Sequence, residues 1–359
     1  MPAPDPSDPR LELAHRWLAE TLCGGDYTLA PASADASFRR YWRVTRGAES
    51  WILMDAPPEK EDSGPFVRIA ARLGTSGVTV PEVLAADLDR GLLLLTDLGS
   101  TPYLSVLTQA SRDRLYGDAL STLLVMQTRV EATGLPGYDE RLLRAELGLF
   151  REWYLERHLG LTLDEGATRA LVAAEERLVA SALRQPRTFV HRDYHSRNLM
   201  VLEHGNPGVL DFQGAVVGPL TYDLVSLLRD CYIAWPEEEV RGMALRYLED
   251  LRAAGLAGGV SQELFLEWLD LMGAQRHLKA VGIFARLWHR DGKPQYLDDI
   301  PRTLRYVRQV SARYRELEPL GDLVDRILID RVGEDGGPAG GRTAGETRAA
   351  PGTGLRRAP

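Results

Sequence analysis

The chain has 359 residues, of which 44% are hydrophobic and 26% are charged, and its formal net charge is −8. These proportions exclude a chain that is disordered over most of its length, because such chains are poor in apolar residues. The longest apolar runs, such as residues 92–95, are far shorter than the roughly 20 residues that a membrane span needs. A net acidic surface repels polyanions. We therefore expect a globular protein with no nucleic-acid or membrane partner.

Cysteine and lysine are both scarce in this chain. Cys23 and Cys231 are too few for a disulfide framework, and residues 1–9 are rich in proline and aspartate where a signal peptide would be apolar. We therefore expect a reducing, cytoplasmic setting in which both cysteines are packing thiols. The only lysines are Lys60, Lys279 and Lys293, so arginine carries most of the positive charge.

The first hundred residues alternate between helical and β-rich patterns. Asp8 or Pro9 can begin a first helix, because apolar residues recur at helical spacing from Leu11 to Leu22, and Gly24 ends it. Two short β-rich runs then flank a polar turn, which predicts a hairpin. The elements expected in this part are a helix from residue 9 to about residue 23, hairpin strands at 41–45 and 51–54, a helix at 65–74, and strands at 78–84 and 92–96.

After Ser100 the pattern is mostly helical, with one interruption at residues 188–215, where short apolar runs alternate with turn signals. The expected helices cover residues 102–108, 112–129, 139–158, 165–182, 221–231, 237–254, 261–290 and 303–317. This order predicts an α+β protein with a small β-rich N-terminal lobe, residues 1–98, and a larger helical lobe, residues 99–331, hinged at Gly99. The remaining residues, 332–359, hold eight glycines and three prolines and are expected to be a disordered tail.

The residues that carry chemistry gather in the interruption. Asp193 follows His-Arg, Asn198 follows after four intervening residues, and Asp211 ends the next apolar run before a phenylalanine. This is the order of a kinase catalytic loop and its metal-binding aspartate. Phosphoryl transfer needs a carboxylate to accept the proton of the attacking hydroxyl and hard oxygen ligands to hold Mg²⁺. We therefore expect Asp193 to be the catalytic base, and Asn198 and Asp211 to be the metal ligands.

A zinc site is the alternative for the two histidines of this loop. His191 and His195 have the spacing of a helical zinc pair, but Arg192 stands where such a motif has glutamate, and no cysteine is nearby. The combined order of the motif favours the kinase interpretation.

The same motifs carry a resemblance to a known family. Residues 191–199, 210–213 and 218–224 resemble the aminoglycoside phosphotransferase and choline kinase-like family, over about residues 11–325 of the chain. Within this family, four stretches resemble the kinases of cell-wall recycling that phosphorylate amino sugars at the anomeric hydroxyl. They are residues 54–59, 94–99, 275–279 and 283–286. The resemblance implies a two-lobed protein-kinase-like fold, ATP and Mg²⁺ as cofactors, no obligate protein partner, and N-acetylmuramate and N-acetylglucosamine as acceptors at their anomeric hydroxyl.

The resemblance also implies a nucleotide site. Residues 33–41 take the place of the family's phosphate-covering loop, although no G-x-G-x-x-G is present. Thr96 and Leu98 match the segment whose backbone binds adenine. The candidate contacts in the loop are Ser37, Phe38, Arg39 and Arg40. From the residues alone, a polar hairpin and an ordinary strand end explain these two stretches as well.

One part of the kinase pattern is missing. Kinases place a lysine on the third strand, held by a helix glutamate, to pair with the α- and β-phosphates. Residues 51–55 contain no lysine, and the helix at 65–74 contains no glutamate. We expect Lys60, or else Arg40, to replace that lysine; the alternative is that Lys60 is a solvated residue of a charged turn.

The acceptor site implied by the resemblance lies among the later helices. Its candidate contacts are Arg192, Arg229, Asp230, Arg276, His277 and Lys279. An arginine can bind the lactyl carboxylate of N-acetylmuramate through two hydrogen bonds. A solvated helix face is the alternative for each of these residues. In the family, the aspartate that matches Asp223 braces the catalytic loop.

Two other functions stay open at this point. The first keeps the chemistry but changes the acceptor to an aminoglycoside, choline, homoserine or another small alcohol, and the acidic balance favours a cationic acceptor. The second is a pseudokinase that binds nucleotide without turnover, against which the intact Asp193, Asn198 and Asp211 argue.

Overall fold

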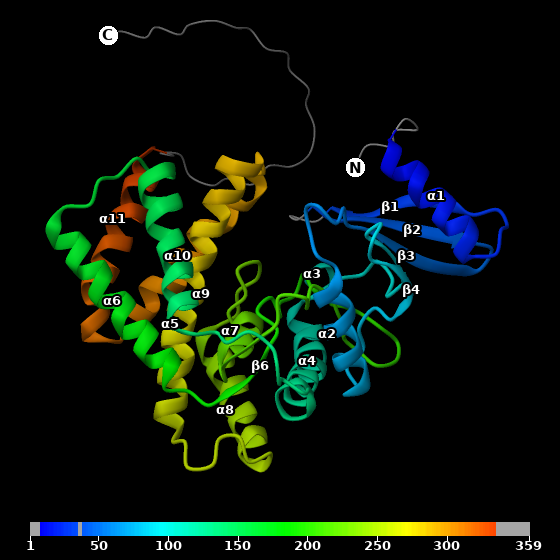
Figure 1. Cartoon of the computed structure of the whole chain (residues 1–359). Coiled ribbons are helices and arrows are strands. Elements are labelled where there is room, and N and C mark those ends of the chain that lie inside the picture. Colours follow the sequence, from blue (N-terminus) through cyan, green and yellow to red (C-terminus); the bar gives the residue numbers. More distant parts are fainter. Residues whose placement is uncertain (1–7, 35–37, 335–359) are drawn as a thin grey trace, which may run out of the picture.

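The computed structural model describes residues 8–34 and 38–334. The N-terminal part holds an antiparallel sheet of five strands in the order β1-β2-β3-β5-β4. Its strands are β1 (Thr28–Ala34), β2 (Arg40–Arg46), β3 (Glu49–Asp55), β4 (Val83–Asp87) and β5 (Leu92–Thr96). Figure 1 shows the sheet on one side of the molecule, with most of the helices gathered on the other. The expected hairpin is present as β2 and β3.

Helices cover both faces of this sheet. Two alternate leucines of β5 pack with Leu18 of α1 (Pro9–Thr21), and the other two pack with Ile69 of α2 (Gly64–Thr75). Successive residues of a strand point to opposite faces. The run of four leucines in β5 therefore fills the core on both sides, which explains why this strand is continuously apolar.

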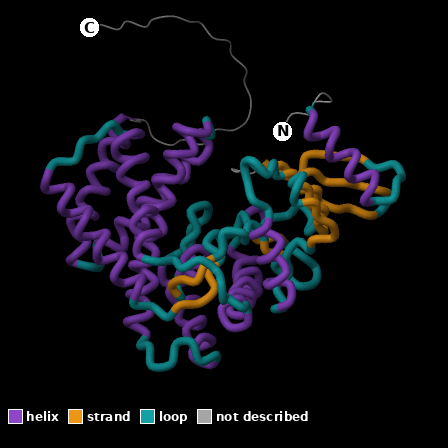
Figure 2. The backbone as a smooth tube through the Cα atoms, viewed as in Figure 1, coloured by secondary structure: helices purple, strands orange, loops and turns teal. Residues whose placement is uncertain are grey.

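The rest of the described chain is mainly helical, with two short strand pairs set among the helices (Figure 2). The helices are α3 (Tyr103–Val106), α4 (Gln109–Arg129), α5 (Glu140–Leu149), the π-helix η1 (Phe150–His158), α6 (Glu165–Leu183), α7 (Tyr222–Leu228), α8 (Glu237–Ala253), α9 (Gln262–Asp291), the 3-10 turn η2 (Pro294–Asp299), α10 (Ile300–Ser311), the 3-10 turn η3 (Arg315–Leu317) and α11 (Glu318–Glu334). The strand pairs are β6 (Arg187–Val190) with β9 (Val216–Pro219), and β7 (Leu199–Met200) with β8 (Gly208–Val209). Among the described residues, no helix has the length and apolar character to cross a membrane.

Helix α9 organises the helical part because it is buried along most of its length. Gly282 lies where α9 meets the junction between α5 and η1, and a Cβ at this position would come within 2.4 Å of the carbonyl carbon of Leu149. Only glycine allows this approach. The contact holds α9 against α5, and these two helices carry residues that face each other at the site described below.

Three expected boundaries are wrong. The strand expected at 78–84 begins only at Val83, since Pro81 has no N–H to donate to a neighbouring strand. The helix expected at 303–317 ends at Ser311, and a separate helix, α11, follows it. Residues 332–334 of the expected disordered tail form the end of α11; the rest of that tail lies outside the described residues.

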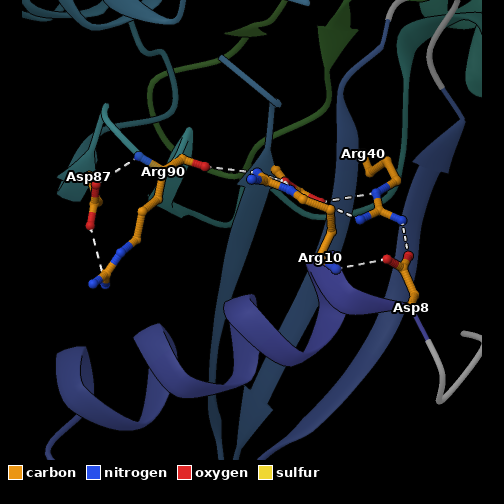
Figure 3. A network of polar contacts seen from close by, with 6 residues as sticks. Asp8, Arg10, Arg40, Asp87 and Arg90 are labelled. Atoms are coloured by element: carbon orange, nitrogen blue, oxygen red, sulfur yellow. Dashed lines mark hydrogen bonds and ion pairs between the residues drawn. The ribbon is translucent and has the colours of Figure 1, made fainter. Parts of the chain in front are cut away.

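A buried carboxylate joins the first helix to the sheet. Asp55 is fully buried and accepts hydrogen bonds from the Nε atoms of Arg10 and Arg40, each at 3.0 Å. Arg40 also pairs with Asp8, and Arg10 also donates to the carbonyl of Arg90 at 2.8 Å (Figure 3). Since Arg40 and Asp55 are directly opposite each other on β2 and β3, both side chains lie on the face that α1 covers.

We predict that Asp55→Asn lowers the free energy of unfolding by about 3 kcal/mol, because it leaves Arg10 without a counter-charge at a buried site and Arg40 with Asp8 alone. Urea unfolding measures the loss. Asp87→Asn is the matched control, since Asp87 pairs with Arg90 at the surface, and there the loss should stay below about 1 kcal/mol. Equal losses in the two variants would contradict a structural role for the buried carboxylate.

Candidate active site

The loop between β6 and β7 carries the expected catalytic residue and is held by two buried carboxylates. Asp223 of α7 accepts hydrogen bonds from the backbone N–H of His191 at 2.6 Å and of Arg192 at 3.0 Å. Asp230, just after α7, accepts from the backbone N–H of Ser196 at 3.0 Å. The loop conformation needs this support, because Arg192 adopts a positive φ of 80°. Asp223 therefore braces the loop, as expected.

Asp193, Asn198 and Asp211 line one cleft of about 890 Å³. The pairing of β7 with β8 brings Asn198 beside Asp211, whose φ is 64°. The Asn198 amide donates to the backbone carbonyl of Asp193 at 3.0 Å, and its nitrogen lies 3.4 Å from Asp211 Oδ2. Gln213 donates to the other carboxylate oxygen of Asp211 at 2.6 Å. The motif residues thus meet at the floor of the cleft.

Asp193 sits among positive charges. Burial by itself raises the pKa of this carboxyl, but the charges of Lys279, Arg276 and Arg192 outweigh it and hold the pKa below its ordinary value. Asp193 is therefore ionised at neutral pH, as a proton acceptor must be. The buried His191 is neutral, because burial lowers its pKa to about 4.

A glutamate that the sequence did not single out balances these cations. Glu146 of α5 lies 3.0 Å from the Lys279 ammonium and also pairs with Arg192. Lys279 donates in addition to the hydroxyl of Tyr222 at 2.9 Å. Because Glu146 is buried and far from the motif in sequence, only the packing of α5 against α9 reveals it.

Only some of the expected acceptor contacts line the cleft. Arg276 and Lys279 do, whereas Arg192 turns toward Glu146. Three others do not line the cleft and are buried. Arg229 pairs with Asp270 at 2.6 Å, His277 bonds the Arg229 carbonyl at 2.8 Å, and Asp230 holds the loop backbone.

The expected phosphate anchors are also placed differently. Arg40 is bound on the α1 face of the sheet, and the Lys60 ammonium lies over the exposed ring of Phe38, 5.1 Å from its centre. Neither residue lines the cleft. Arg39 does approach the site: it is buried, pairs with Glu61, and lies 3.9 Å from an oxygen of Asp211. Ser37 lies outside the described residues.

The cleft continues beneath the sheet, where Thr96 and Leu98 line it together with apolar side chains. The segment after β5 is fixed by an ion pair, in which Arg43 of β2 binds Asp97 at 2.6 Å and 3.0 Å and the Gly99 carbonyl at 2.9 Å. The apolar lining includes Ile52, Leu95, Met200, Leu210 and Phe212. A flat aromatic group between such side chains would find backbone donors and acceptors at the cleft edge.

The sequence pattern of the phosphotransferase enzyme family matches residues 28–257. The chain belongs to the phosphotransferase enzyme family. Two relatives named N-acetylmuramate/N-acetylglucosamine kinase are similar in sequence to this chain over most of their lengths. The one from Pseudomonas aeruginosa is 52% identical over 297 residues, 82% of this chain and 87% of that protein. The one from Pseudomonas putida is 45% identical over 330 residues, 89% of this chain and 97% of that protein.

Solved structures share the fold of this phosphotransferase at low sequence identity. Choline kinase LicA from Streptococcus pneumoniae has a TM-score of 0.60 at 12% identity, covering 85% of this chain and 99% of that one. The GDP complex of aminoglycoside 2'-phosphotransferase-IIIa has a TM-score of 0.58 at 14% identity, with the same coverage of 85% and 99%. These likenesses confirm the expected protein-kinase-like fold.

For this phosphotransferase we predict that Lys279→Met raises the pKa of Asp193, because less positive charge then opposes the effect of burial. A base with a higher pKa is protonated earlier as the pH falls. The ratio of variant to wild-type kcat/KM should therefore decrease from about pH 8 to about pH 5. Profiles of kcat/KM against pH measure this ratio. Lys293→Met is the control, because Lys293 does not line the cleft. A constant ratio would mean that Lys279 does not keep Asp193 ionised.

Proposed function

We propose that this phosphotransferase is a cytoplasmic, ATP- and Mg²⁺-dependent kinase that phosphorylates the C1 hydroxyl of N-acetylmuramate and N-acetylglucosamine for peptidoglycan recycling. The observation that carries the chemistry is the meeting of an ionised Asp193 with Asn198 and Asp211 in one cleft. The names of relatives that are up to 52% identical support these two sugars as the substrates. The position of the phosphate and the pathway rest on the family resemblance. The division into lobes at residues 98 and 99 belongs to the same proposal.

The residues present fit a magnesium–nucleotide complex. Mg²⁺ prefers hard oxygen ligands and is usually held by one or two carboxylates together with substrate phosphates. Asn198 and Asp211 offer an amide and a carboxylate group to the cleft. Within the described residues no group of three or more His, Cys, Asp or Glu side chains could hold a metal by itself, which suits a metal that arrives with its nucleotide. Bound there, Mg²⁺ would neutralise phosphate charge.

Arg39 is the best candidate for the phosphate anchor that the third strand lacks. Its guanidinium lies 3.9 Å from an oxygen of Asp211, which lines the cleft, and Glu61 holds it as the helix glutamate holds the lysine of other kinases. Arg39 directly precedes β2, in which Tyr41 lines the cleft and Arg40 points to the opposite face.

The acceptor end of the cleft disfavours a polycationic aminoglycoside. Arg197, Arg276 and Lys279 line it beside Asp193, so three cations face one carboxylate there, and Glu146 does not line it. A cationic acceptor would meet like charges there, whereas a neutral or anionic sugar would not. The proposed mechanism has Asp193 accept the proton of the sugar hydroxyl as that oxygen attacks the γ-phosphorus of ATP. The bond from this phosphorus to the bridging oxygen breaks and ADP leaves, while Arg276 and Lys279 stabilise the charge that develops.

The proposed function predicts a sugar 1-phosphate. Incubation of the enzyme with ATP, Mg²⁺ and either sugar should give an acid-labile product whose NMR spectrum shows phosphorus coupling at C1. Asp193→Asn keeps the shape of the side chain but cannot accept a proton, and turnover should fall by about 10²–10⁴-fold. A 6-phosphate would contradict the anomeric assignment, and full activity of Asp193→Asn would contradict the catalytic one.

A second prediction compares the two candidate anchors directly. Arg39→Met should lower kcat/KM for ATP at least tenfold, or about 1.4 kcal/mol, because the phosphates lose a positioned cation. Lys60→Met removes a cation of similar size that stacks on Phe38 outside the cleft, and its kcat/KM should stay within about twofold of wild type. Steady-state kinetics with ATP as the varied substrate distinguish them. The reverse ranking would restore Lys60 as the anchor.

A further inference from the structure

Arg197 is a cation of the catalytic loop to which neither the motif nor the family resemblance gave a role. It directly precedes Asn198 and lines the same cleft. Its side chain is 40% exposed, whereas the other two cations at the acceptor end, Arg276 and Lys279, are buried. Arg197 is therefore the cation there that an incoming ligand reaches first.

Two aromatic rings hold the Arg197 guanidinium in place. It lies 3.6 Å from the ring centre of Tyr232, which follows α7, and 5.6 Å from that of Tyr296 in η2. Stacking uses the faces of the guanidinium group and leaves its N–H groups, which lie in the plane, directed outward. The rings thus orient a planar double donor without consuming its hydrogen bonds.

Within the described chain, no carboxylate occupies those donors. The nearest is Asp299, whose Oδ2 is 3.9 Å from Arg197, beyond hydrogen-bonding distance. Asp299 is already bound by Arg302, which donates to its other oxygen at 2.9 Å. The ion pair with Arg197 is therefore weak, and a better-placed carboxylate can replace it.

The other two cations of the acceptor end are engaged within the protein. Lys279 is bound to Glu146 and Tyr222, and Arg276 is buried against the Cys231 sulfur at 3.6 Å while it helps to keep Asp193 ionised. Phe284 of α9 contacts both of the rings that flank Arg197, with ring centres 6.2 Å from Tyr232 and 5.8 Å from Tyr296, and it lines the cleft together with Ile283. A ligand that presents a carboxylate beside a small hydrocarbon group matches this combination.

We propose that Arg197 binds the carboxylate of the lactyl ether of N-acetylmuramate and so sets the preference for this sugar over N-acetylglucosamine. The two sugars differ only in that ether, which adds one carboxylate and one methyl group. A bidentate guanidinium–carboxylate pair is among the stronger hydrogen-bonded contacts in proteins. The assignment rests on the proposed function and names the residue that separates its two substrates.

The test is the ratio of kcat/KM for the two sugars in wild type, Arg197→Met and Arg197→Lys. Arg197→Met should lower kcat/KM for N-acetylmuramate by about 10–100-fold, the range expected for a hydrogen bond to a charged group, mainly through KM. For N-acetylglucosamine, which has no carboxylate, the change should stay below about threefold. Arg197→Lys keeps the charge but loses the double donor, so it should fall between wild type and Arg197→Met.

Arg114→Met is the control for removing an arginine, since Arg114 is 64% exposed on α4 and does not line the cleft. Equal losses on both sugars in Arg197→Met would leave the ratio unchanged and would mean that Arg197 only positions the loop. Wild-type kcat/KM on both sugars would also refute the assignment. No wild-type turnover on either sugar would instead refute the proposed function itself. The two failures are therefore distinguishable in one set of assays.

Discussion

The site depends on one buried carboxylate more than on any residue that faces the cleft. Asp223 receives two backbone N–H groups of the catalytic loop, and burial raises its pKa to about 7 although those N–H donors favour its charged form. Asp223 is therefore a hydrogen-bond acceptor in surroundings that solvate it poorly. Its hydrogen bonds fix the geometry of the loop, because Arg192, at a positive φ, keeps that conformation only when its neighbours hold it.

Around that loop, buried carboxylates pair with the nearby cations and fix their positions. Glu146 offsets Lys279 and Arg192, and their net positive effect still keeps Asp193 ionised. Asp270 and Asp230 do comparable work further from the cleft, holding Arg229 and the loop backbone. Buried carboxylates thus serve mainly to fix the position of cations and loops, while the groups left facing the cleft are the ones available for chemistry.

The sequence predicts site residues that lie close together along the chain, and it misses residues that only the fold brings to the site. The motif residues and Asp223 were predictable because a single loop and the helix after it carry them. Glu146 was not, since it is far from the loop in sequence and reaches it only because Gly282 lets α9 approach α5. The elements were mostly correct, but Pro81 displaced the start of β4, and α11 lay beyond the last pattern that we assigned.

Some of the errors were avoidable from periodicity. The residues of α9 that line the cleft are 276, 279, 280, 283, 284 and 287, the spacing of one helix face, and His277 falls outside it. The corresponding rule for a strand, in which alternate residues share a face, separates Arg40 from Tyr41, which lines the cleft.

The net charge of the chain does not describe the charge that lines its cleft. The chain carries −8 overall, yet the part of the cleft that we propose for the acceptor is lined by Arg197, Arg276 and Lys279. The field that a substrate meets is set by the few groups within a Debye length of about 8 Å, so the sign of the whole protein does not decide its acceptor.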